Sequence, residues 1–121
     1  MAEGIGEARD SLQRTLDLLR RMSGGRITQV DSTDYSIRVQ KAQNILLQNE
    51  KKIWLKTKDG KEMVRRLSEA SSRLLATARD LEKSSETDSK TLNDLTAALK
   101  EVELNARQME EESRRRSMVV T

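Results

Sequence analysis

The sequence predicts an all-α protein, either an elongated helical bundle or a coiled coil, with about three helical segments and a long C-terminal heptad helix. Its 121 residues include no proline, so the residue that breaks helices most strongly is absent. Apolar residues recur at alternating spacings of three and four, which is the period of an amphipathic helix. They make up only 35% of the chain, and Trp54 and Tyr35 are the only aromatic residues. This composition suits long helices packed along narrow seams, or a core that partner chains complete.

Residues 1–23 form the first expected segment, an N-terminal amphipathic helix. Its apolar stripe contains Ile5, Ala8, Leu12, Leu19 and Met22. Gly24 and Gly25 follow, and glycine readily adopts the left-handed conformation that ends many helices. We therefore expect a connector over residues 24–33.

A central helix is expected over residues 34–58, with one of the polar residues at 32–34 as its N-cap. Leu46 and Ile53 continue the spacing of three and four, and Trp54 widens the apolar face. A face of this width predicts contact with more than one neighbouring helix.

The longest heptad pattern runs through residues 61–116 and predicts a long coiled-coil helix, followed by a tail over residues 117–121. Its large apolar core positions are Leu67, Leu74, Leu81, Leu92, Leu95, Leu99, Val102 and Met109. Small residues such as Ser71 and Ala78 share this seam, so an isolated two-stranded zipper would bury little apolar surface. The pattern therefore favours a bundle of three or four helices.

One polar run, over residues 83–90, interrupts the long seam and places Asp88 at a core position. An unpaired carboxylate buried there would cost several kcal/mol. A solvated stretch, a hinge or chain reversal, and a functional polar layer would each avoid that cost. The sequence leaves open whether residues 61–116 form one rod or a hairpin broken near residues 84–90.

The composition gives catalysis little chemistry to use. The chain has no cysteine and no histidine, which excludes disulfides, Cys/His zinc sites and thiol or imidazole catalysis. The acidic residues form no calcium-loop pattern and no arrangement with a nucleophile. We expect a protein that is not an enzyme and has no cofactor or metal. Because no apolar run reaches about 18 residues and no signal-peptide core is evident, we expect a cytoplasmic location.

The charges nearly balance, with 23 basic and 20 acidic residues and a net charge of +3, but the basic residues are clustered. Five lysines lie near Trp54 in the sequence, and they are candidates for contact with an acidic surface such as nucleic acid, an anionic membrane or a microtubule: Lys51, Lys52, Lys56, Lys58 and Lys61. The alternative is a solvated helix face on which Trp54 anchors a contact between helices. The three arginines at 114–116 follow three glutamates, so pairing within the helix is their simplest interpretation.

One stretch of the chain, and the chain as a whole, each resemble a known family of helical proteins. Residues 95–103 resemble the C-terminal coiled coil of small subunits in lysosome-related-organelle complexes, which implies a non-catalytic complex subunit. The helices and heptads, with a start such as residues 11–15, resemble the cytosolic part of a SNARE. A SNARE motif should carry glutamine or arginine in its middle layers, where this chain has Ser85 and Asp88. Neither resemblance assigns the chain to a family.

We therefore expect a non-enzymatic helical scaffold or adaptor subunit, in a setting such as membrane trafficking or a cytoskeletal complex. It would assemble with its own copies or with partner chains by burying the eight seam residues and the face formed by Leu46, Ile53 and Trp54. The first alternative is a basic helical module that docks on acidic surfaces through the five lysines. The second alternative is a SNARE-like fusion or tethering factor.

Overall fold

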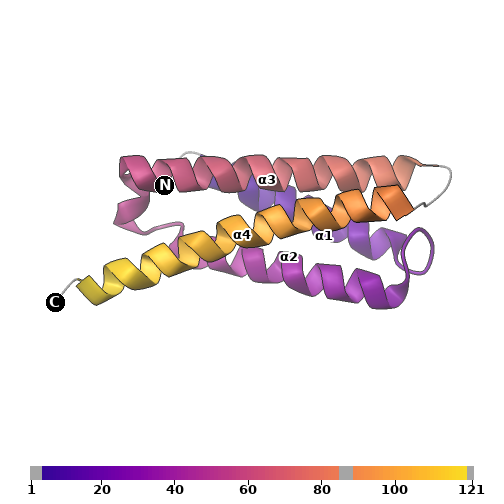
Figure 1. Cartoon of the computed structure of the whole chain (residues 1–121), viewed down its shortest axis with the longest axis horizontal. Helices are drawn as coiled ribbons and strands as arrows, with labels where there is room; N and C mark the ends of the chain where they lie inside the picture. The colour runs from indigo at the N-terminus through magenta and orange to yellow at the C-terminus, as the bar shows by residue number, and fades with distance from the viewer. Residues whose placement is uncertain (1–3, 85–88, 120–121) are drawn as a thin grey trace.

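The computed structural model describes residues 4–84 and 89–119, and it confirms the all-α helical bundle. The described helices are α1 (Ile5–Met22), α2 (Gln29–Asn49), a short 3-10 helix η1 (Ile53–Lys56), α3 (Lys58–Lys83) and α4 (Ser89–Val119). Figure 1 shows an elongated bundle in which successive long helices run in opposite directions.

The helices are not arranged around the bundle in chain order. α1 packs on α2 and α3, and α4 packs on the same two helices, whereas within the described residues the pairs α1–α4 and α2–α3 share no such interface. The order around the bundle is therefore α1, α2, α4, α3. The connector between α2 and α3, residues 50–57, must cross one end of the bundle diagonally, and Figure 1 shows it at the end where α4 finishes.

The connector closes this end of the core. Leu55 of η1 is fully buried, while the connector backbone lies directly on the first turn of α3. A Cβ atom at Gly60 would be 2.5 Å from the Cα of Leu55, so only glycine fits there without a shift of the backbone. Thr57 caps α3 by accepting a hydrogen bond from the Gly60 amide at 3.1 Å.

The long helix expected over residues 61–116 is a hairpin of α3 and α4. α3 ends at Lys83, where the Ser84 amide donates to the Asp80 carbonyl at 3.0 Å, and α4 begins at Ser89. Of the alternatives left open at the polar run, the structure has the chain reversal. Asp88 itself lies outside the described residues. The hairpin brings the two halves of the seam face to face, so they bury each other's apolar residues.

The central helix also differs from the expected one over residues 34–58. It begins at Gln29, because Thr28 is the N-cap and accepts a hydrogen bond from the Asp31 amide at 3.0 Å. It ends at Asn49, since Lys52 has an extended backbone and η1 follows. The connector before it is accordingly shorter than residues 24–33, and Gly24 has the left-handed conformation expected after the first helix, with φ +84°.

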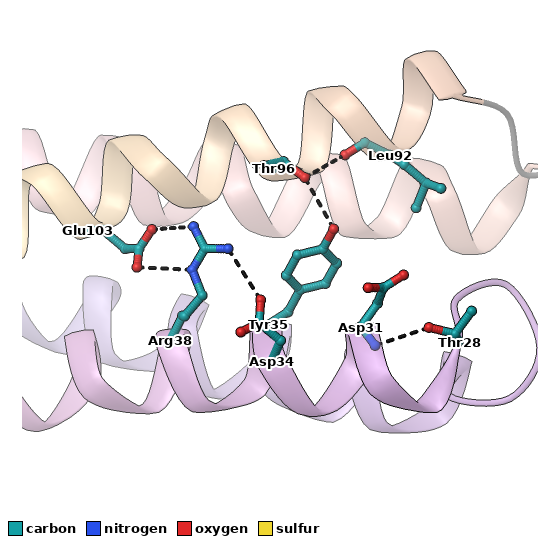
Figure 2. Close-up of polar contacts among 8 residues, drawn as sticks. All are labelled: Thr28, Asp31, Asp34, Tyr35, Arg38, Leu92, Thr96 and Glu103. Carbon is teal, nitrogen blue, oxygen red and sulfur yellow. Dashed lines mark hydrogen bonds and ion pairs between the residues drawn. The ribbon is translucent and has the colours of Figure 1, made fainter.

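Polar contacts hold the N-terminal half of α2 against α4, as Figure 2 shows. The Arg38 guanidinium donates to both carboxylate oxygens of Glu103, at 3.0 Å from Nε and 2.5 Å from Nη2. Tyr35 Oη lies 3.1 Å from Thr96 Oγ1, which itself donates to the Leu92 carbonyl, so the tyrosine is the donor. Hydrogen bonds from Arg38 hold the pKa of the Glu103 carboxyl below its usual value, against the opposing effect of burial.

Candidate binding site at the Trp54 end of the bundle

A cleft of about 720 Å³ lies between the connector and the C-terminal part of α4. Lys52, Ile53 and Trp54 form its wall on the connector, and Arg115 and Arg116 are on the α4 side. Most of its exposed lining is apolar. We call it the Trp54 cleft. Figure 1 shows α4 diverging from α3 toward its C-terminus, with the connector at the same end of the bundle.

The two arginines of the cleft are held by one acidic residue of their own helix. Arg116 Nε donates to Glu112 Oε1 at 2.8 Å, and Arg115 also pairs with Glu112. The Arg116 guanidinium lies over the Trp54 ring, 5.3 Å from its centroid, which is a cation–π contact. Two positive charges therefore share one carboxylate, and Lys52 adds a third positive charge to the rim. The pairing predicted for the arginines at 114–116 is confirmed, since Arg114 also lies 3.9 Å from Glu110.

The five candidate lysines lie on the connector and the first turn of α3, and only Lys52 lines the cleft itself. We call them the lysine cluster: Lys51, Lys52, Lys56, Lys58 and Lys61. All five side chains are exposed, and none forms an ion pair with any residue in the described part of the chain. Lys58 and Lys61 stand in the first turn of α3, where the helix dipole adds positive potential instead of compensating it. Asp59 is the one acidic residue of that turn, so the five lysines leave the surface with a net positive charge.

The structure places most of the predicted partner-binding residues inside the chain's own core. Those that are at most 1% exposed are Leu46, Leu67, Leu74, Leu81, Leu95, Leu99, Val102 and Met109. Leu92 is partly buried and packs against the same core. They contact one another within a single chain, so they can reach a partner only if the bundle opens.

Ile53 and Trp54 differ from that group. The spacing of Ile53 predicts a place on the apolar stripe of the central helix, but its side chain is 81% exposed because α2 has already ended. Trp54 is partly buried and packs against the core. Its indole Nε1 is buried and has no hydrogen-bond partner within residues 4–84 and 89–119. These two residues remain accessible to a partner at the closed bundle's end.

Sequence patterns did not predict that residues of α4 would lie beside Trp54 in the cleft. Arg115 and Arg116 are more than 60 positions from Trp54 along the chain, and only the hairpin and the diagonal connector bring them together. Ser113 and Ser117, one helical turn apart, line the same wall. In the sequence, only the run of three arginines at 114–116 marked this part of α4 as a possible contact surface.

The described residues hold no group of histidine, cysteine or acidic side chains that could bind a metal ion. Among those same residues, no helix combines the length and the apolar character needed to cross a lipid bilayer.

The fold and the site together define a four-helix bundle with a diagonal connector and a basic, partly apolar cleft at one end. No protein-family model matches the chain, and neither the curated proteins nor the solved structures contain a match.

Proposed function

We propose that the chain is a non-enzymatic binding module, an adaptor that docks on an acidic partner through the Trp54 end of the bundle. The observation that supports the proposal is that the exposed lysine cluster and an apolar cleft occupy the same end of a closed bundle, with Lys52 belonging to both. Exposed charges that have no ion-pair partner among the described residues give long-range attraction to an acidic surface. The apolar cleft adds short-range contact, which makes the association more than a charge effect.

Docking from outside requires no change in the bundle. Assembly through the seam, or a SNARE-like exchange of helices, would first have to expose residues such as Leu67 and Leu99, which are at most 1% exposed. Uncovering several such side chains costs about 1.5–3 kcal/mol for each. The closed bundle therefore favours the basic end as the binding surface.

Binding to polyglutamate tests the proposal, with the fluorescence of Trp54 as the signal. Trp54 is the only tryptophan, so its emission reports on the site without a label. We expect saturable binding that weakens steeply as the salt concentration rises, because salt screens exposed charges. Replacing Lys51, Lys52 and Lys56 with glutamate should weaken binding at least about tenfold, since like charges then face the ligand.

The matched control makes the same change of charge at the opposite end of the bundle. Arg79, Lys83 and Lys90 are exposed residues at the α3–α4 hairpin end, and their replacement with glutamate should change the affinity little. Equal losses for both triple variants would show that net charge alone controls binding. That result, or binding that does not depend on salt, would contradict the proposal.

A further inference from the structure

The Trp54 cleft combines a basic rim, formed by Lys52, Arg115 and Arg116, with an apolar interior formed by Ile53 and Trp54. A ligand that matches both parts needs acidic groups and an apolar group together. We propose that the cleft binds an acidic peptide segment of a partner protein, which inserts a bulky aliphatic side chain beside Trp54. This inference rests on the proposed function, because it names the class of acidic partner that the basic end recognises.

The rim selects for carboxylates. Arg115 and Arg116 present guanidinium groups that share Glu112, and the contact with Trp54 helps to hold Arg116 in place. Guanidinium groups bind carboxylates through paired hydrogen bonds, and a preorganised group loses less side-chain entropy on binding. Lys52 lies on the opposite wall of the cleft. A peptide with acidic residues on both sides of its apolar anchor would meet positive charge on both walls.

The interior selects for an apolar anchor. Ile53 is 81% exposed, and Trp54 forms the neighbouring wall. The volume of about 720 Å³ lies within the range of roughly 300–1,000 Å³ that is common for ligand pockets. A leucine-sized side chain in the cleft would remove both its own surface and that of Ile53 from water. Apolar burial of this kind is favourable in proportion to the area covered.

The shape of the site favours a peptide over a bilayer or a nucleic acid. The cleft is an open groove between the connector and α4, with Lys52 on one wall and Arg115 and Arg116 on the other. An extended peptide with acidic residues on either side of an apolar anchor matches this arrangement of charges. Base stacking needs a free aromatic face, but Arg116 lies over the Trp54 ring, which is also partly buried against the core. The other aromatic residue, Tyr35, lies at the α2–α4 contact, where it bonds to Thr96. A side chain that projects from a peptide can cover Ile53 in this groove and leave the cation–π contact intact.

The first part of the test compares three probes on the full chain by the emission of Trp54 and by calorimetry. One is a set of acetylated hexapeptides with four acidic residues around a central pair, which is Leu-Leu, Ile-Leu or Val-Leu. The second is the matched peptide with a central Ser-Ser pair, and the third is phosphatidylserine vesicles. We expect at least one aliphatic peptide to bind about tenfold more tightly than the Ser-Ser peptide, because it covers apolar surface in the cleft.

The second part removes the apolar wall without disturbing the fold. Ile53→Ser changes a side chain that is 81% exposed, so the bundle should remain stable. The variant should lose most of the preference for the aliphatic peptide, whereas its affinity for the Ser-Ser peptide and for polyglutamate should fall much less, because the charges that attract them remain. Ile37→Ser is the matched control, because Ile37 is 64% exposed on α2 and does not line the cleft. It should retain the full preference.

The outcomes separate this inference from the proposed function. If polyglutamate binds through the lysine cluster but no aliphatic peptide binds better than the Ser-Ser peptide, the proposed function stands and the peptide inference is overturned. Tighter binding to vesicles than to every peptide, with the effect lost in Ile53→Ser, would overturn it in favour of a membrane. If no acidic probe binds at all, the proposed function itself fails.

Discussion

Leu99 provides the most direct test of the closed bundle, because the sequence alone placed it at an interface with partners. Its side chain is 1% exposed in the core of the single chain. Leu→Ala changes at such positions cost roughly 3–5 kcal/mol through lost burial and the cavity left behind. With an unfolding entropy of about 2.1 cal/mol/K per residue, the 121-residue chain has a slope of about 0.25 kcal/mol/K. A loss of about 3 kcal/mol therefore lowers the Tm of Leu99→Ala by about 12 °C.

Thermal unfolding followed by circular dichroism measures this shift. Repeating it over a hundredfold range of protein concentration shows whether the core forms within one chain or between chains. For a core within one chain, the Tm of the wild type and of Leu99→Ala should not depend on concentration. Leu104→Ala is the control on the same helix, because Leu104 is 48% exposed and should cost less than about 1 kcal/mol. A Tm that rises with concentration, together with equal losses for the two variants, would refute the burial of the seam within one chain.

Two further predictions concern the contacts that hold α2 and the connector. Since the pKa of Glu103 is lowered chiefly by hydrogen bonds from Arg38, the ionised carboxylate stabilises the fold above about pH 4.5, and this stabilisation is lost as the pH falls through the lower folded-state pKa. In urea titrations, Glu103→Gln should therefore cost about 0.5–1 kcal/mol at neutral pH and should differ little from the wild type at the most acidic pH, whereas a difference independent of pH would contradict the assignment. Gly60→Ala should destabilise the fold by about 1–3 kcal/mol, because its Cβ atom would lie 2.5 Å from the Cα of Leu55. Gly6→Ala, which meets nothing within 4 Å, should instead be neutral or stabilising in the same titration, and equal effects of the two changes would contradict the close packing of the connector.

The sequence predicted the helices better than their partners, and the seam shows why. A heptad pattern establishes that an apolar stripe exists, but it does not say whether the covering helix belongs to the same chain. Leu81 and Leu92 are eleven residues apart, so the spacing of three and four continues across the hairpin as though the helix were unbroken. The polar residues between them gave the only indication of a reversal.

The candidate site was predictable in part for a similar reason. Composition alone singled out Trp54 and the lysines around it, and these residues do lie together at one end. The error at Ile53 arose because its spacing fits the stripe of α2, whereas the helix ends at Asn49. The contribution of Arg116 depends on the order of the helices around the bundle, which local patterns do not encode.

That order links the stability of the protein to the position of its site. Because α3 lies diagonally opposite α2, the chain must cross the end of the bundle, where the fully buried Leu55 and the partly buried Trp54 close the core. The preceding residues Ile53 and Lys52 are then held at a fixed place without contributing buried surface. Binding at this end can therefore change through substitutions at exposed positions, whereas changes at Leu55 would disturb the fold and the cleft together.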